Sequence, residues 1–254
     1  MTWRNDSGLA QRSVVVTGAA GGIGRSVTKA FAEAGAFVVA VDVPGSPVGE
    51  VVAALPGGPH LAIEANLLDL AGHAAIFDRA AELAPLAALA HLAAVLRRKT
   101  NVEDVTEEDW DLQLDVNLKV TFFLDRAAHT AFRKAGTPGA IVNFTSQGWW
   151  TGGFGGSVVY AASKGGVTTL TKGLARSFAP SGVRVNAVSP GGVDTPMMNQ
   201  GMSPGAMETF LTTVPLGRLA QTDELTGAVL FLASDASSYV TGSVINVSGG
   251  QLMY

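Results

Sequence analysis

The sequence predicts an α/β fold built on one doubly wound, seven-stranded parallel sheet with helices on both faces. Short runs of β-branched and apolar residues alternate with longer segments of helical period, which is typical of βαβ units. Most of these runs are apolar throughout, as expected for strands that helices cover on both sides. The chain has 254 residues, of which 47% are hydrophobic and 15% charged. We therefore expect a single domain over residues 1–254 with a sizeable core.

The individual elements follow from these patterns along the chain. An apolar strand at 13–17 leads through a glycine-rich turn into a helix at 22–34, and the next strand, 37–42, is again apolar until its last residue. Gly35 and Gly136 stand where C-terminal caps of helices are expected. The long irregular stretch 191–217 is rich in proline and methionine, and we expect it to form a substrate lid. Further strands are expected at 60–66, 86–95, 140–145, 184–189 and 243–247, and further helices at 48–55, 69–84, 106–135, 158–179 and 222–234.

Composition and charge exclude several classes of protein. The chain has no cysteine, and therefore neither a disulfide framework nor a thiolate metal site. Its histidines, His60, His73, His91 and His129, lack the spacing of metal ligands. No apolar run is long enough to cross a bilayer, and residues 1–12 contain no apolar signal segment. The net charge is −4 and the lysines and arginines do not cluster on one face, so the sequence does not predict a surface that binds nucleic acid. We expect a cytoplasmic protein without metal, membrane or nucleic-acid partners.

A glycine-rich turn follows the first strand and opens the first helix. It reads Thr17-Gly18-Ala19-Ala20-Gly21-Gly22-Ile23-Gly24. Glycines allow a sharp turn and close approach of a pyrophosphate, and the helix N-terminus offers free N–H donors to the negative charge. The next strand ends at Asp42, whose carboxylate can bind the ribose hydroxyls of NAD and would repel the additional phosphate of NADP. The sequence therefore predicts a Rossmann fold that uses NAD, bound by Gly18, Gly21, Gly22, Ile23, Gly24 and Asp42.

Tyr160 and Lys164 supply a phenol and an ammonium one helical turn apart. Side chains at positions i and i+4 share one face of a helix. An ammonium beside a phenol favours the phenolate and lowers its pKa from about 10 toward physiological pH, where it can exchange a proton with an alcohol or a ketone. This spacing predicts acid–base chemistry in which Lys164 lowers the pKa of Tyr160.

Together these motifs resemble the short-chain dehydrogenase/reductase family, nearly from end to end. The turn at 17–24 is similar to the family's glycine motif, and Tyr160 and Lys164 match its Tyr-x-x-x-Lys. Ser146 matches its catalytic serine, and Asn117 matches its helix asparagine. Further segments that resemble the family are 186–196, which would pack along the nicotinamide, and 215–218, 231–234 and 249–250 near the C-terminus.

The resemblance implies roles for these residues. Tyr160 would act as general acid and base, Ser146 would hold the substrate oxygen, Lys164 would also hold the nicotinamide ribose, and Asn117 would bind a relay water through its helix backbone. The resemblance implies a homotetramer, with helices 106–135 and 158–179 paired across one two-fold axis and 243–254 near another; the low charge content favours an oligomer independently. Further cofactor contacts are implied for Asn66, Leu67, Ala93, Ala94, Pro190, Gly191, Val193 and Thr195.

The chain departs from the family's pattern at several places, and the interval from Ser146 to Tyr160 is also one residue longer than in many relatives. Where most relatives have Asn-Asn-Ala-Gly, it reads His91-Leu92-Ala93-Ala94. The side chain of Leu92 cannot make the hydrogen bonds that asparagine makes to neighbouring strands. Ala94 adds a methyl group where the main chain passes close to the cofactor. His91 is expected to be an ordinary residue of the sheet without a functional role. Asn66 stands where relatives usually have the aspartate that binds adenine, and its amide oxygen can still accept a hydrogen bond. Near the C-terminus, Ser248 stands where an aspartate is common.

Two loops are expected to form the substrate pocket. An apolar pocket around one polar reaction centre would suit a small or medium, partly apolar substrate. For the cationic run 97–99 we favour a solvated loop over a carboxylate-binding role. The expected pocket residues are Ser146, Gln147, Trp149, Trp150 and Phe154 on one wall, and Met197, Met198, Met202, Met207 and Phe210 in the lid.

The leading prediction is an NAD-dependent oxidoreductase that transfers hydride between NAD(H) and a small-molecule secondary alcohol or ketone. A reductase of acyl groups on acyl carrier protein is the alternative within the enzyme class, although Ser181 stands where such relatives often carry arginine. A dinucleotide-binding regulator without turnover is the alternative outside it. Only the altered segment 91–94 favours that reading.

Overall fold

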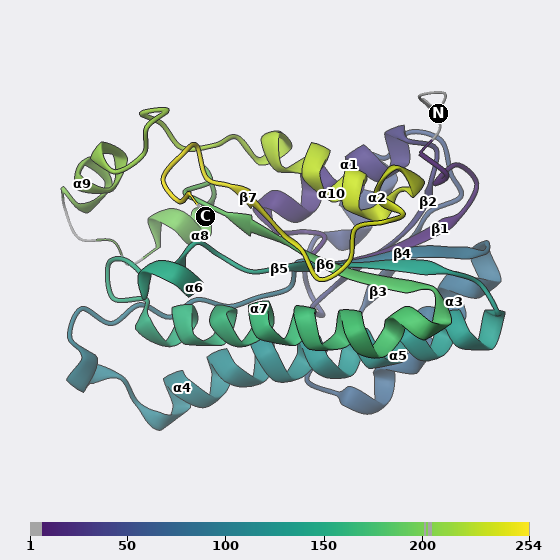
Figure 1. Ribbon diagram of the computed structural model, residues 1–254, viewed down its shortest axis with the longest axis horizontal. Helices are drawn as coiled ribbons and strands as arrows, with labels where there is room; N and C mark the ends of the chain where they lie inside the picture. Colours follow the sequence, from purple (N-terminus) through teal and green to yellow (C-terminus); the bar gives the residue numbers. More distant parts are fainter. Residues whose placement is uncertain (1–6, 201, 203–204, 254) are drawn as a thin grey trace.

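A computed structural model gives the structure of the chain and describes residues 7–200, 202 and 205–253 (Figure 1). Its centre is an all-parallel sheet in the order β3-β2-β1-β4-β5-β6-β7, which confirms the predicted doubly wound, seven-stranded architecture. The strands are β1 (Ser13–Thr17), β2 (Phe37–Asp42), β3 (Leu61–Glu64), β4 (Leu86–His91), β5 (Gly139–Phe144), β6 (Val183–Pro190) and β7 (Val244–Val247).

Helices cover both faces of this sheet (Figure 1). One face carries α1 (Gly22–Glu33), α2 (Val48–Ala53) and α10 (Thr226–Ala233), and the other carries α3 (His73–Leu83), α4 (Glu107–Leu114), α5 (Val120–Ala135) and α7 (Val158–Phe178). Short helices lie in the loops that follow β5 and β6: α6 (Gly148–Thr151), α8 (Pro196–Asn199) and α9 (Ala206–Thr212). Within the described residues no helix is both long and apolar enough to span a membrane.

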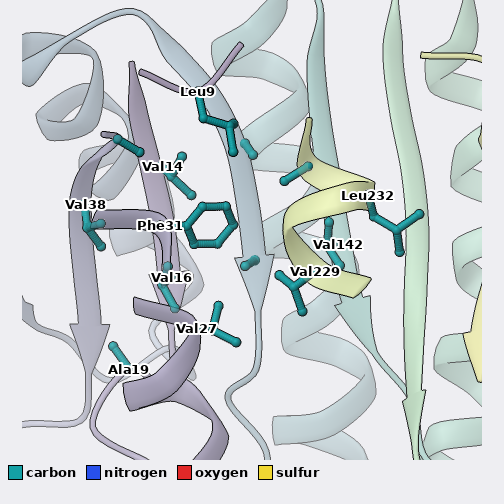
Figure 2. Packing of buried hydrophobic residues seen from close by; sticks show 14 of the residues in the cluster. Leu9, Val14, Val16, Ala19, Val27, Phe31, Val38, Val142, Val229 and Leu232 are labelled. Atoms are coloured by element: carbon teal, nitrogen blue, oxygen red, sulfur yellow. The ribbon is translucent and has the colours of Figure 1, made fainter. Parts of the chain in front are cut away.

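Alternating strand residues build two apolar cores, one on each side of the sheet. Val14 and Val16 of β1 face α1 and α10, where they pack around the fully buried Phe31 (Figure 2). Val15 points to the opposite side and joins the cluster beneath α3, α5 and α7. This division explains why the strands read as continuous apolar runs, because both of their faces are covered.

Several predicted elements are shorter or more divided than expected. The predicted helix 106–135 is interrupted by a π-helical turn at Asp115–Lys119, and the helices predicted at 69–84 and 222–234 begin with 3₁₀ turns, Leu70–Gly72 and Thr222–Leu225. The strand predicted at 86–95 ends at His91, and further along the main chain of Val95 bonds to the side chain of Asn117. The strand predicted at 60–66 narrows to Leu61–Glu64. The predicted lid 191–217 contains α8 and α9, and its positions 201, 203 and 204 lie outside the described residues.

A row of buried polar side chains crosses the sheet beneath α5 and α7. The strand register places Thr17, His91 and Asn143 side by side on β1, β4 and β5. Thr17 Oγ1 lies 2.6 Å from His91 Nδ1, and Asn143 Nδ2 donates to Asp125 Oδ2 at 2.8 Å and to Thr171 Oγ1 at 3.2 Å. Burial raises the pKa of Asp125 to about 8, although the hydrogen bond from Asn143 acts in the opposite direction. The folded protein therefore holds Asp125 as a neutral acid at neutral pH.

Replacing Asp125 by asparagine is expected to remove a pH-dependent loss of stability. The ordinary pKa of an aspartate, which we take for the unfolded chain, is 3.8, and burial raises the pKa of Asp125 in the folded protein to about 8. Its contribution is therefore fully present below the lower value and is lost as the pH rises through the higher one. From about pH 5 to about pH 8, the free energy of unfolding of Asp125→Asn should gain several kcal/mol relative to the original protein in denaturant titrations. Asp78→Asn is the control, because Asp78 is an exposed partner of Lys134; parallel pH profiles for all three proteins would contradict the prediction.

Candidate active site

The carboxyl ends of five neighbouring strands surround one cavity of about 550 Å³. Its walls come from the segments that follow β2, β1, β4, β5 and β6, together with α7 and α8. β4 pairs with β1 although two strands separate them in the sequence, and in doubly wound sheets a crevice opens where the strand order reverses in this way. The predicted site residues that line the cavity are Gly18, Gly21, Gly22, Ile23, Gly24, Asp42, Ala93, Ala94, Ser146, Gln147, Phe154, Tyr160, Lys164, Pro190, Gly191, Val193, Thr195, Met197, Met198 and Phe210.

The other predicted site residues lie outside this cavity. Asn66 is exposed and its Oδ1 accepts a hydrogen bond from the main chain of Leu68, while Leu67 packs into the core beneath α3 and α5. Trp150 is 61% exposed and stacks edge-to-face on Trp149, with ring centroids 5.3 Å apart. Neither indole therefore forms the pocket wall that the sequence predicted. The remaining predicted residues beyond the cavity lining are Asn117, Met202 and Met207.

The glycine turn between β1 and α1 is packed so closely that side chains are excluded. Gly18 has a φ of +67°, and a Cβ built on it would lie 2.8 Å from the main-chain nitrogen of Ala93. A Cβ on Gly24 would collide with the Gly18 carbonyl oxygen. Among the described residues, no side chain caps the N-terminus of α1 at Gly21. The first N–H groups of α1 therefore remain free to bind an anionic group such as a pyrophosphate.

Asp42 stands at the end of β2, beside the glycine turn. Its Oδ2 accepts a hydrogen bond from Ala20 N and its Oδ1 accepts one from Val43 N, both at 2.8 Å. These bonds hold the carboxylate at the cavity wall. The cations in the cavity lining are Arg98 and Lys164, which follow β4 and lie in α7, so no lysine or arginine of the lining follows β2.

Ser146, Tyr160 and Lys164 come together beyond β5. Ser146 follows β5 and its Oγ accepts a hydrogen bond from Gly148 N at 3.2 Å. Tyr160 and Lys164 lie one turn apart in α7, and the Lys164 Nζ atom is 5.6 Å from the centroid of the tyrosine ring. Lys164 is buried and donates to the carbonyl oxygen of Phe144 at 2.8 Å. The three side chains therefore reach the cavity from two elements that pack together.

The electrostatics of Tyr160 differ from the sequence prediction. Burial raises the pKa of Tyr160 to about 12, and the nearby charge that acts to lower it belongs to Arg98. Burial also lowers the pKa of Lys164 to about 7, so this side chain is only partly charged at neutral pH. The prediction that the Lys164 ammonium lowers the pKa of Tyr160 was therefore wrong for this structure, because the lysine is itself desolvated and bonded to a carbonyl group.

Asn117 acts on the site from behind the cavity. It lies in the π-helical turn, and its side chain accepts from Val95 N at 2.8 Å and donates to Val95 O at 2.9 Å. Its Nδ2 also donates to Ser163 Oγ at 3.1 Å, and that hydroxyl donates to the carbonyl oxygen of Tyr160 at 2.7 Å. Asn117 thus connects the segment after β4 to the first turn of α7.

The cationic run after β4 is not a uniformly solvated loop. Arg97 and Lys99 both pair with Asp109, at 3.3 Å and 3.0 Å, and a capping box with Thr106 holds that carboxylate at the start of α4. Arg98 instead is half-buried and lines the cavity. The sequence prediction was wrong for Arg98, since three adjacent cations give no signal that separates the middle one from its neighbours.

The chain is similar to known proteins over nearly all of its length. A family model described as enoyl-(acyl carrier protein) reductase matches residues 18–251. L-xylulose reductase from Bos taurus is 38% identical to it, over 97% of this chain and 99% of that protein. Cis-4-hydroxycyclohexanecarboxylate dehydrogenase from Sinomonas cyclohexanicum is 37% identical, over 95% and 97%. A solved structure from Agrobacterium tumefaciens, assigned as a 2-deoxy-D-gluconate 3-dehydrogenase and holding NADP, matches with a TM-score of 0.88 and 32% identity, over 98% and 99% of the two chains.

These similarities extend over the whole sheet and are not confined to the nucleotide-binding half. The matched residues begin within the glycine turn and continue past β7, so they include the segments that carry Ser146, Tyr160 and Lys164. The chain belongs to the short-chain dehydrogenase/reductase family of oxidoreductases.

Proposed function

We propose that this protein is an NAD-dependent dehydrogenase that oxidises a secondary alcohol to a ketone and catalyses the reverse reduction. The observation that carries the proposal is the single cavity shared by the glycine turn of α1 and by Ser146, Tyr160 and Lys164. The turn offers free N–H donors to a pyrophosphate, and the three side chains offer hydrogen-bonding and proton-transfer groups. One cavity can therefore hold a dinucleotide and a small alcohol together.

The chemistry divides between the cofactor and the side chains. When bound, a nicotinamide dinucleotide accepts a hydride from the carbinol carbon or returns it to the carbonyl carbon. In oxidation, Tyr160 as phenolate takes the hydroxyl proton, and in reduction the neutral phenol gives it back. Ser146 holds the substrate oxygen through its hydroxyl group. Lys164 holds the ribose next to the nicotinamide, and Asn117 positions α7 through Ser163.

We propose that NAD is preferred to NADP because of Asp42, although the A. tumefaciens relative holds NADP. Charged hydrogen bonds are worth about 1.5–3 kcal/mol, equivalent to about 10- to 100-fold in affinity. Replacing Asp42 by alanine should therefore lower the ratio of kcat/KM for NAD to that for NADP by about 10- to 100-fold. Glu64→Ala is the matched control, because Glu64 pairs with Asp42 in the strand register but does not line the cavity. An unchanged ratio in Asp42→Ala would refute this role.

The substrate class follows from the walls near Tyr160. Phe154, Met197, Met198 and Phe210 are apolar and line the same cavity as Tyr160. The relatives reported above act, by name, on small alcohols or ketones. The description of the matching family model favours, as a second candidate, a reductase of acyl groups on acyl carrier protein. Turnover of a free acyl thioester that exceeds turnover of every simple ketone would favour this second candidate.

A panel of secondary alcohols tests the proposal directly. The purified protein is mixed with NAD and each alcohol, and formation of NADH is followed by absorbance. Reduction of NAD with at least one alcohol is expected. Tight binding of NAD without any turnover would instead favour a regulator that keeps the fold but not the chemistry.

We also propose that residues 1–254 form one domain that assembles as a homotetramer. One sheet contains strands from both ends of the chain, which supports the single domain. A shallow apolar groove runs along α5 and α7 and includes Leu118, Phe122, Phe123 and Leu170, and 38% of the Phe122 surface is exposed. Pairing of these helices between two copies would bury that surface.

A further inference from the structure

Arg98 connects the two loops that enclose the reaction centre. Its Nη1 donates to the carbonyl oxygens of Phe154 at 2.8 Å and Gly155 at 3.4 Å, both in the loop between β5 and α7. Its Nε donates to Gln200 O at 3.0 Å and its Nη2 to Met198 O at 3.4 Å, both in the segment after β6. Carbonyl groups from both sides therefore hold the guanidinium group in a defined orientation at the cavity wall.

The charge of Arg98 has no counterion within the part of the chain that the structure describes. Its neighbours Arg97 and Lys99 both pair with Asp109, whereas every hydrogen bond of Arg98 goes to an uncharged carbonyl oxygen. A guanidinium group has five N–H donors, and two of them belong to Nη2. Since Nη2 makes one of the four bonds, one of its N–H groups has no partner among the described residues.

The unpaired charge lies close to the proposed reaction centre. Arg98 and Tyr160 line the same cavity, and the charge of Arg98 acts to lower the pKa of the tyrosine. Burial lowers the pKa of Arg98 itself, which means that its charge is partly dehydrated. A half-buried cation gains most from a partner that carries a full negative charge.

The surroundings restrict the chemistry of such a partner. Phe154, Met197, Met198 and Phe210 supply apolar walls, and one N–H group of Arg98 remains available. A phosphate group would bring more charge and require more donors than this wall provides. A carboxylate on a short carbon skeleton matches one available donor, one full positive charge and apolar walls.

We propose that Arg98 binds the carboxylate group of the substrate, so that the substrate is a hydroxy acid and the product the corresponding oxo acid. This inference rests on the proposed function, because it concerns the substrate of the same reaction. The hydroxyl group is oxidised with loss of a hydride and a proton, and the carboxylate remains unchanged. Arg98 therefore selects the substrate by charge, whereas Tyr160 performs the proton transfer.

The test compares acids with their own methyl esters. Oxidation of 3-hydroxybutanoate and 3-hydroxycyclohexanecarboxylate is measured beside that of the two methyl esters. In the original protein, kcat/KM should be at least about 10-fold higher for the acids, and in Arg98→Met this ratio should fall to about 1. Arg98→Lys should retain part of the preference. Arg97→Met is the matched control and should leave the ratio unchanged, because Arg97 pairs with Glu108 and Asp109.

Using a ratio separates charge recognition from a purely structural role of Arg98. If Arg98 only holds the loops together, Arg98→Met would slow acids and esters equally, and the proposal would be overturned. A second measurement does not require turnover: calorimetric titration with cyclohexanecarboxylate and with cyclohexanecarboxamide, in the presence and absence of NADH. Tighter binding of the carboxylate that disappears in Arg98→Met supports the proposal even if no alcohol is oxidised. Equal binding of the two compounds overturns it, while oxidation of neutral alcohols would leave the proposed function standing.

Discussion

Replacing Tyr160 by phenylalanine is expected to lower the rate of alcohol oxidation by about 1,000-fold or more. The substitution removes one oxygen atom, and with it the group that we propose takes the hydroxyl proton while hydride leaves the carbinol carbon. The ring remains, so the packing of α7 and the affinity for NAD should change by no more than about twofold. Steady-state kinetics and a fluorescence titration with NADH measure the two quantities separately.

The pH dependence provides a second signature of the same residue. Burial raises the pKa of Tyr160 to about 12, so the phenol is protonated across the neutral range. Oxidation requires the phenolate and should accelerate as the pH rises, whereas reduction requires the neutral phenol and should not. The residual activity of Tyr160→Phe should lose this rise. Tyr239→Phe is the control, because Tyr239 is fully exposed. Substantial turnover by Tyr160→Phe, with an unchanged pH profile, would show that another group handles the proton.

Replacing Gly24 by alanine is expected to abolish dinucleotide binding. The added methyl group would collide with the carbonyl oxygen of Gly18, which is main chain and cannot rotate away as a side chain could. Relief requires movement of the turn, although Gly18 is itself held against the main chain of Ala93. We expect the Kd for NAD to rise by at least about 100-fold. The free energy of unfolding should fall by about 1–3 kcal/mol, the usual cost of overpacking.

Gly49→Ala is the matched control for this substitution. Gly49 also lies in the first turn of a helix, α2, but a Cβ built on it meets no atom of the described residues within 4 Å. Alanine should therefore leave NAD binding unchanged and stabilise the protein by up to about 1 kcal/mol, because it favours the helix. Binding of NAD by Gly24→Ala with the affinity of the original protein would mean that the turn does not hold the pyrophosphate.

The sheet could be predicted because its strands are buried on both faces. β1 and β2 have the predicted bounds. Each is a short apolar run with polar or glycine residues on both sides, so the pattern leaves little choice of where the strand begins and ends. Boundaries were less accurate where a side chain from a distant element replaces the strand ladder. Asn117 bonds to Val95 within the predicted strand 86–95, and no local pattern in that segment contains that information.

The sequence predicted the parts of the site that consist of short motifs. It did not predict the parts that depend on contacts between residues far apart in the sequence. The glycine turn and the spacing from Tyr160 to Lys164 lie within single elements and their adjoining turns. The role of Arg98 depends on carbonyl groups more than fifty residues away along the chain. The prediction that Trp150 lines the pocket was wrong for a related reason. A large apolar side chain in a loop is usually buried, but Trp150 belongs to the four-residue helix α6, which places its side chain in an exposed position.

The strand order also has a consequence for how the chain folds. Every neighbouring pair in the described sheet joins consecutive strands except β1 and β4, whose residues are paired about seventy positions apart. During synthesis, β1, β2 and β3 can form a small sheet early, but the second edge of β1 stays open until β4 has emerged. An open apolar edge is exposed to aggregation in that interval. The crevice where the strand order reverses forms only with this non-local pairing, which has the largest sequence separation in the described sheet. A dinucleotide bound across that crevice would therefore stabilise the junction of highest contact order.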